Sequence, residues 1–257
     1  MGRIIGTIYG IAVYVFFLCA FLYAIGFVEN VAVHKSIDAP GAGALSATAL
    51  LVNAALLGLF AVQHSVMARP AFKRWWTRIV PRSVERSTFV LFASLALAQL
   101  CWQWQPIAGA VWTVTEPGPA YALQAVSWFG WGLVLASTFL ISHFELFGVL
   151  QVVARLRGRE LPEPKFRTPV LYRYVRHPIY LGFILAFWAT PVMTLGHLVF
   201  SVATTGYILL GIWFEERDLV AQFGERYRAY RDQVGMLLPF KKLLARPQRG
   251  EAQASPR

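Results

Sequence analysis

Long uncharged runs of apolar residues dominate the sequence and are separated by short polar loops. The first run, residues 4–28, contains no charged side chain. A membrane-spanning helix needs about 20 apolar residues, so this run is long enough to cross a bilayer. Five further runs follow, at residues 44–67, 88–105, 120–142, 178–195 and 198–214. The pattern therefore predicts an all-α, polytopic integral membrane protein with about six transmembrane helices.

The last two apolar runs are short and lie close together in the sequence. Gly196 and His197 stand between them, and this pair predicts a tight turn that joins two helices into a hairpin. Beyond the hairpin, Leu219, Phe223 and Tyr227 recur at steps of four, which places them on one face of a helix. We expect this part to be an amphipathic helix that lies on the cytoplasmic membrane surface.

Composition and charge agree with a membrane protein. Of the 257 residues, 57% are hydrophobic and only 14% are charged, whereas soluble domains carry about 25% charged residues. The net charge is +11, but the basic side chains concentrate in the loops at 68–87 and 143–177. The loops at 29–43 and 106–119 contain a single basic residue, Lys35. This alternation predicts that both chain termini are cytoplasmic, and we expect no nucleic-acid partner.

The chain shows no sign of a second domain, a disulfide framework or a metal site. Cys19 and Cys101 both lie within apolar runs and neither belongs to a CxxC pair, so we expect them to be small buried residues. The first apolar run is longer than the core of a cleaved signal peptide, which spans about 7–15 residues, and is interpreted as a retained helix. We expect one domain over residues 1–243 and a disordered tail over 244–257. The oligomeric state stays open.

A basic cluster lies at the start of the fifth apolar run, in "RYVRHPIYLGF" (173–183). Pro178 is favourable as the first residue of a helix, because its missing N–H is not needed there. The helix N-terminus presents free N–H groups and a positive dipole end, and together with Arg176 and His177 it forms a candidate anion site. The alternative is a basic membrane anchor with an ordinary helix start, which the spacing alone favours.

Two carboxylates, Glu215 and Glu216, stand where the sixth run ends. A hairpin brings this end close to Arg176, so one small region offers an anion site and carboxylates. S-adenosylmethionine carries a carboxylate, a ribose diol and a cation that suit both. The aromatic side chains that could contact its adenine or its sulfonium are Tyr172, Tyr180 and Tyr227. The alternative for the acidic stretch is the surface helix alone.

These motifs resemble those of the isoprenylcysteine carboxyl methyltransferase superfamily, which also includes phospholipid N-methyltransferases. The resemblance rests on "LYRYVRHPIYLGF", followed about thirty residues later by "EERDLVAQFGERYRAYRDQVGMLLPF". It implies a cytosol-facing S-adenosylmethionine site within residues 143–240. The cofactor contacts that it implies are Gln151, Phe166, Thr168, Tyr172, Arg176, His177, Pro178, Tyr180, Glu215 and Glu216, to which Tyr227 is added.

Four other stretches resemble bacterial methanethiol S-methyltransferases. They are "FAVQHSVMARPAFKRWW" (60–76), "ERSTFVL" (85–91), "ISHFELFGVLQV" (141–152) and "FWATPVMTLGHLVF" (187–200). The resemblance implies methylation of methanethiol to dimethyl sulfide by an enzyme of the bacterial inner membrane. Two alternatives stay open. One is a methyltransferase that acts on a prenyl-cysteine carboxylate or a lipid amine, and the other is a non-enzymatic accessory protein of the NnrU type.

A thiol acceptor raises the question of a base, because a thiolate is far more nucleophilic than a thiol. His64 and His143 each stand at the predicted cytoplasmic end of a span and are the candidates for this role. Glu145 follows His143 by two residues and could orient it. His34 and His197 are predicted on the opposite side of the membrane and are excluded. The alternative for both candidates is that they are ordinary polar side chains at the membrane interface.

Overall fold

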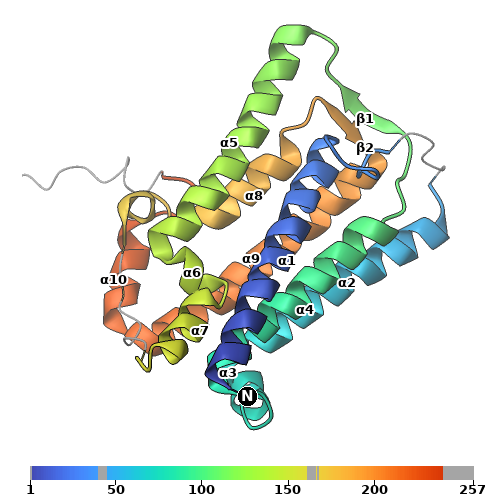
Figure 1. The fold of residues 1–257 in the computed structure, drawn as a ribbon. Coiled ribbons are helices and arrows are strands. Elements are labelled where there is room, and N and C mark those ends of the chain that lie inside the picture. Colours follow the sequence, from blue (N-terminus) through green and yellow to red (C-terminus); the bar gives the residue numbers. More distant parts are fainter. Residues whose placement is uncertain (1, 40–44, 161–165, 167, 240–257) are drawn as a thin grey trace, which may run out of the picture.

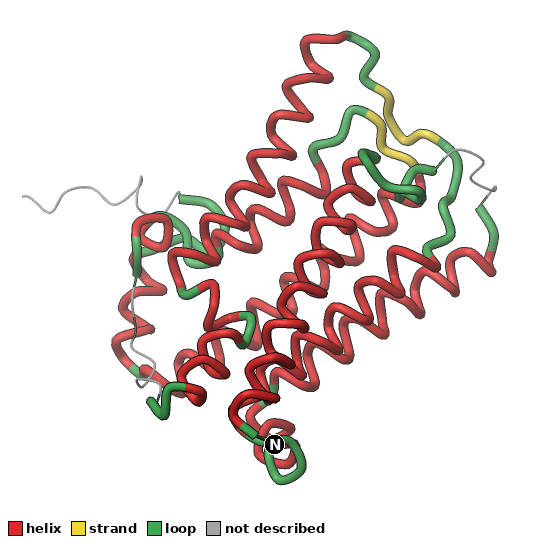
Figure 2. Tube along the Cα trace, viewed as in Figure 1, coloured by secondary structure: helices red, strands yellow, loops and turns green. Residues whose placement is uncertain are grey.

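The computed structural model describes residues 2–39, 45–160, 166 and 168–239. The predicted disordered tail, 244–257, lies outside these residues. The described chain is mostly helical (Figure 1), with two short strands at one end (Figure 2). The elements are α1 (Arg3–Glu29), α2 (Ala47–Ala68), α3 (Pro70–Trp76), α4 (Arg82–Gln103), β1 (Ala110–Thr113), α5 (Pro117–Ile141), α6 (His143–Leu146), α7 (Val149–Leu156), the 3-10 helix Val170–Arg173, α8 (Pro178–Trp188), β2 (Val192–Thr194), α9 (Leu195–Phe223) and α10 (Glu225–Gln233).

Five of the described helices, α1, α2, α4, α5 and α9, are long and apolar enough to cross a membrane. The predicted all-α polytopic membrane fold is thereby confirmed. The fifth apolar run forms only the 11 residues of α8, which extend about 16 Å at 1.5 Å per residue. This length covers about half of a hydrocarbon core that is about 30 Å thick.

The long helices pack in two groups around α1. Helix α4 packs against both α1 and α2, and α5 packs against α8. In Figure 1 the strands and the loops that flank them lie at one end of the bundle, whereas the N-terminus, α3, α7 and α10 lie toward the other end. The second end carries the candidate site described below and is called the site end.

The predicted turn at Gly196 and His197 is wrong, because both residues belong to the first turn of α9. The hydroxyl of Thr194 accepts a hydrogen bond from the backbone N–H of His197 at 3.1 Å. This N-cap starts the helix before the predicted turn. The connection between α8 and α9 is instead the stretch 189–194, which includes β2, and β2 pairs antiparallel with β1.

Side chains from other helices satisfy the backbone where α8 ends. The carbonyl of Phe187 accepts hydrogen bonds from His197 Nε2 at 3.0 Å and from the Ser201 hydroxyl at 2.8 Å. The carbonyl of Ala186 accepts one from the Ser127 hydroxyl at 2.9 Å. Unpaired backbone groups are costly at membrane depth. These contacts therefore explain how a short helix followed by extended chain is tolerated here.

His197 also belongs to a buried polar cluster at the end that bears the strands. Its Nδ1 lies 3.0 Å from Asp38 Oδ2, and the Thr194 hydroxyl donates to Asp38 Oδ1 at 2.5 Å. Burial raises the pKa of the Asp38 carboxyl, but the hydrogen bond and charge of His197, together with hydrogen bonds from Thr194 and Asn30, outweigh this effect, so that the pKa lies below its usual value. The cluster holds the loop after α1 against the start of α9.

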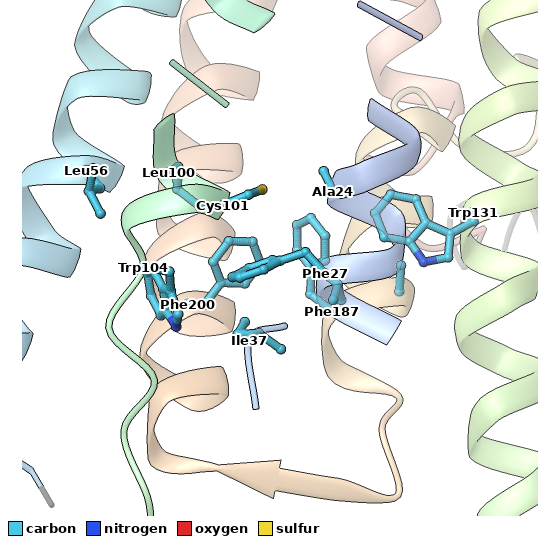
Figure 3. Close-up of a cluster of buried hydrophobic side chains, with 12 residues drawn as sticks. Ala24, Phe27, Ile37, Leu56, Leu100, Cys101, Trp104, Trp131, Phe187 and Phe200 are labelled. Carbon is cyan, nitrogen blue, oxygen red and sulfur yellow. The ribbon is translucent and has the colours of Figure 1, made fainter. Parts of the chain in front are cut away.

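The hydrophobic core in this half of the molecule combines five aromatic side chains with smaller apolar ones (Figure 3). Phe27 of α1 lies edge-on to Trp104 and to Phe200 of α9, with ring centroids 6.3 and 6.5 Å apart. Cys101 is buried beside them, as predicted, whereas Cys19 is exposed. Both cysteines are free.

The backbones of helices α5 and α8 come into close contact where two glycines face each other. A Cβ atom built on Gly182 would lie 2.6 Å from the carbonyl oxygen of Gly130, and the reverse distance, from a Cβ on Gly130 to the Gly182 oxygen, is also 2.6 Å. Small residues let helix backbones approach in membranes. The two glycines therefore fix the spacing between α5 and α8. This spacing also sets where the two helices lie at the site end.

The substitution Gly182→Ala is expected to separate α5 from α8, because backbone atoms cannot move aside for the new methyl group. Overpacking of this kind costs about 1–3 kcal/mol. The matched control is Gly132→Ala on α5, where a Cβ would meet nothing within 4 Å. Thermal unfolding in detergent should show a lower midpoint for Gly182→Ala alone. Equal midpoints for the two variants would contradict the close contact.

Candidate functional site

The site is built around the start of α8, which is fastened to the chain that follows α10. Val175 pairs in parallel with Gly235. The backbone N–H of Arg176 donates to the Gly235 carbonyl at 2.9 Å, and that of His177 donates to the Met236 carbonyl at 3.2 Å. Pro178 is the first residue of α8, as predicted. The motif that opens α8 and the end of the described chain therefore form one unit.

Glu216 is the anion that Arg176 and His177 contact. Its Oε1 lies 2.7 Å from Arg176 Nε, 2.7 Å from Arg176 Nη2 and 3.1 Å from His177 Nε2. Arg176 Nη1 donates to the backbone carbonyls of Arg231 and Val234. Both basic side chains are buried. The expected anion site is therefore filled by a carboxylate of the protein itself, and Arg176 connects α8, α9 and α10.

Glu215, the second carboxylate, is more open than Glu216. Its Oε2 accepts a hydrogen bond from the Tyr180 hydroxyl at 2.9 Å and lies 3.8 Å from His177 Nδ1. The side chain of Glu215 is 45% exposed, against 13% for Glu216. Glu215 is thus the carboxylate that can accept hydrogen bonds from the hydroxyl groups of a ligand.

The predicted stripe of Leu219, Phe223 and Tyr227 does not lie on one helix. Gly224, with φ +56°, ends α9, and Tyr227 belongs to α10, where it is 2% exposed. The expectation of a continuous amphipathic surface helix is therefore wrong. The break turns α10 back toward the site, and Tyr227 is buried there.

Aromatic side chains line the region between α10 and the segment before α8. Phe166 packs against Phe223, Tyr227 and Tyr230, with ring centroids 5.4–5.9 Å apart. The Tyr230 hydroxyl donates to the backbone carbonyl of Tyr172 at 2.5 Å. The structure thus brings Tyr172 and Tyr227 into one neighbourhood with the carboxylates. Sequence reasoning missed Tyr230, although it lies within the recognised acidic motif.

Two of the predicted cofactor residues each carry a buried polar atom that has no hydrogen-bond partner among the described residues. These atoms are the hydroxyl of Tyr227 and Oε1 of Gln151. Burial raises the pKa of Tyr227 above its usual value, so its hydroxyl stays a hydrogen-bond donor at neutral pH. Buried polar groups are normally paired, and the Tyr227 hydroxyl therefore fits contact with a polar ligand.

A surface cleft of about 280 Å³ opens beside Glu216, between α9 and α10. Its other lining residues are Trp213, Arg217, Val220 and Arg231. Small-molecule pockets have volumes of about 300–1,000 Å³. The volume of the cleft is close to the lower end of this range. Its walls place the indole ring of Trp213 and the basic side chains of Arg217 and Arg231 beside Glu216.

Two predicted cofactor residues lie outside the polar cluster. Gln151 belongs to α7, where its Nε2 donates to the carbonyl of Glu145 at 3.0 Å. Thr168 precedes the 3-10 helix, and its carbonyl accepts from Arg173 Nε at 3.4 Å. Among the described residues, neither Gln151 nor Thr168 forms a hydrogen bond with Glu215 or Glu216.

His143 starts α6, at the site end of α5, and is buried. Its Nδ1 lies 2.9 Å from the Thr138 hydroxyl and its Nε2 lies 2.8 Å from the Tyr14 hydroxyl. Its ring stacks on Phe139 with centroids 4.3 Å apart. Burial lowers the pKa of His143, so the imidazole is neutral and able to accept a proton at pH 7.

The predicted orientation of His143 by Glu145 is wrong, since Tyr14 and Thr138 occupy both ring nitrogens. No sequence signal marks Tyr14, which stands in an uncharged run like any lipid-facing aromatic residue. His64, the other candidate base, stacks on Phe60 at 5.4 Å, and its Nδ1 is buried without a partner among the described residues.

Comparisons with known proteins agree with the resemblance in the sequence. Residues 47–234 match the family described as "Protein of unknown function (DUF1295)". A relative from Bradyrhizobium diazoefficiens named "Methanethiol S-methyltransferase 1" is 54% identical over 93% of this chain and 84% of its own length. One from Mycobacterium tuberculosis named "Methanethiol S-methyltransferase" is 55% identical over 93% of this chain and 98% of its own length.

A more distant relative, "Nurim" from Rattus norvegicus, is 30% identical over 77% of this chain and 74% of its own length. No solved structure matches the chain. The match to the family model covers well over half of the sequence. The chain belongs to the DUF1295 family and, within it, to the group of membrane proteins named methanethiol S-methyltransferases.

Proposed function

We propose that this protein is a membrane enzyme that uses S-adenosylmethionine to methylate methanethiol, with dimethyl sulfide as the product. The observation that carries the proposal is that the cluster of Glu215 and Glu216 and the imidazole of His143 lie at the same end of the packed helices α5, α8 and α9. The names of the relatives supply the thiol. A bound S-adenosylmethionine would supply an electrophilic methyl group on a positively charged sulfur.

The residues for holding the cofactor follow from their chemistry. The exposed carboxylate of Glu215 suits the ribose hydroxyls, and the unpaired hydroxyl of Tyr227 suits a polar group of the cofactor. The rings of Phe166 and Tyr172 suit the adenine. Glu216 positions Arg176 and His177 and, through them, holds the start of α8 in place.

The same proposal includes the orientation in the membrane. Basic residues gather at the site end, in and around α3 and at the end of α7, and include Arg69, Lys73, Arg74, Arg78, Arg155 and Arg157. Positively charged loops stay on the cytoplasmic side of a membrane. We therefore place the site end and both termini in the cytoplasm of a bacterial cell, with the helices in the inner membrane.

The test is to supply methanethiol and S-adenosylmethionine to membranes that contain the protein. Dimethyl sulfide is expected in the headspace, well above the level from membranes that carry an empty vector. A methyl-labelled cofactor separates the alternatives in the same assay, because a prenyl-cysteine or lipid-amine acceptor would carry the label into the lipid fraction. Bound cofactor without dimethyl sulfide would refute the assignment of the acceptor.

A further inference from the structure

The imidazole of His143 is held in one tautomer. The Thr138 hydroxyl donates its proton to the carbonyl of Leu135 at 2.7 Å. The oxygen of that hydroxyl must therefore accept from Nδ1–H of His143, 2.9 Å away. In the neutral ring Nε2 then carries the lone pair, and it accepts the hydroxyl proton of Tyr14 at 2.8 Å. The proton acceptor of His143 thus points at Tyr14.

The surroundings of His143 suit a small apolar molecule. The ring stacks on Phe139 and lies edge-on to Phe144, with centroids 5.4 Å apart, and Phe147 lies at 4.8 Å. The hydroxyls of Tyr14 and Thr138 are the hydrogen-bonding groups that contact the imidazole among the described residues. Tyr14 is partly exposed, whereas His143 is buried. A small thiol would therefore reach the Tyr14 hydroxyl before it reached the imidazole.

This aromatic cluster around His143 and the carboxylate cluster lie on the same side of a contact between α1 and α8. Phe21 of α1 lies edge-on to Phe183 of α8, with ring centroids 6.3 Å apart. Tyr14 is seven residues closer to the site end of α1, and Tyr180 is three residues closer to the site end of α8. At 1.5 Å per residue these steps are about 10 and 4.5 Å. Tyr14 and Tyr180 therefore both lie below this contact, toward the site end.

We propose that Tyr14 is the catalytic residue that contacts the thiol and that His143 is the base that receives the proton through Tyr14. This inference rests on the proposed function. The S–H bond of the thiol breaks as its proton moves to the Tyr14 oxygen, and the Tyr14 O–H proton moves to Nε2 of His143. The thiolate forms a bond to the methyl carbon of the sulfonium donor, whose own S–C bond breaks with the electron pair. The products are dimethyl sulfide, the demethylated donor with a neutral thioether sulfur, and the imidazolium of His143. The imidazolium then releases its proton to water.

The test compares Tyr14→Phe with Tyr9→Phe, a control on the same helix whose hydroxyl bonds Thr88 Oγ1 at 3.1 Å. At neutral pH, Tyr14→Phe should lower kcat/KM for methanethiol by about 10²-fold, the smaller end of the range for proton transfer by a positioned group. The kcat/KM of Tyr9→Phe should stay within about twofold of the wild-type value, because this variant keeps the Tyr14 hydroxyl that transfers the proton. The defect of Tyr14→Phe should shrink as the pH rises, because free thiolate no longer needs a base. Calorimetry should show unchanged affinity for S-adenosylmethionine.

Each other result overturns the inference in a distinguishable way. If the wild type makes dimethyl sulfide and Tyr14→Phe matches it, Tyr14 is not catalytic and the proposed function stands. A defect of the same size at every pH would indicate a structural role for Tyr14. A wild type that binds cofactor but makes no product would remove the proposed function and this inference together. If Tyr14→Phe does not fold, Thr138→Val is tested instead. This variant removes the hydroxyl that holds the His143 proton on Nδ1, and it must show the same pH-dependent loss of kcat/KM.

Discussion

Glu216→Ala is expected to abolish cofactor binding and to lower the free energy of unfolding by about 3–5 kcal/mol, the range for removing one partner of a buried ion pair. The substitution leaves Arg176 and His177 buried without the carboxylate that both contact. The start of α8 then loses the ion pair that ties it to α9, whereas the contacts of Tyr180 and His177 with Glu215 remain. Calorimetry with S-adenosylmethionine and thermal unfolding in detergent measure the two effects.

The matched control is Glu225→Ala, which removes a carboxylate from an ion pair on the surface of α10. Glu225 contacts Arg228, and their side chains are 83% and 52% exposed. Exposed pairs of this kind contribute little, so binding and stability should both stay close to those of the wild type. If Glu216→Ala fails to fold, Glu216→Gln keeps the size and an acceptor oxygen and tests the charge alone. Wild-type cofactor affinity in either variant of Glu216 would exclude this carboxylate from the site.

The sequence predicts the helices well because a bilayer imposes its length on the chain. An uncharged run of about 20 residues has few alternatives to a helix in lipid. Helices α1, α2 and α5 follow their runs within three residues at each end, whereas α4 begins six residues before its run. The short helix α8 is harder to predict. Its end depends on His197 and Ser201 from α9, which satisfy the carbonyl of Phe187, and such long-range contacts leave no periodic signal.

The polar cluster shows a similar division. The resemblance and the hairpin predict that Arg176 and Glu216 are close, because the two motifs lie at the ends of adjacent helices. The resemblance and the hairpin do not predict that Arg176 and Glu216 form an ion pair with each other. Nor do they predict that Glu215 is the more exposed carboxylate. The break at Gly224 was missed because the step of four from Phe223 to Tyr227 is also compatible with one continuous helix. A glycine with positive φ breaks that helix, although the apolar spacing continues through it.

His143→Ala is expected to lower kcat/KM for methanethiol by about 10²- to 10⁴-fold at neutral pH, the range for general acid–base catalysis. The loss arises because the thiol of the substrate is mostly protonated there and the variant has no group to accept its proton. The variant should regain activity as the pH rises, because its rate follows the fraction of free thiolate. His64→Ala is the control, since it removes the other candidate base.

The pH profile of the wild type gives an independent test of the same role. Burial lowers the pKa of His143, so the neutral imidazole persists below about pH 6.5, the ordinary value for histidine. If His143 is the base, the acid limb of kcat/KM should fall below that value, and the limb should disappear in His143→Ala. If His143→Ala leaves the pH profile unchanged and His64→Ala alters it, the base that accepts the thiol proton is His64. The two histidines contact different helices, so the outcome also decides whether the thiol is deprotonated beside α1 and α5 or beside α2 and α4.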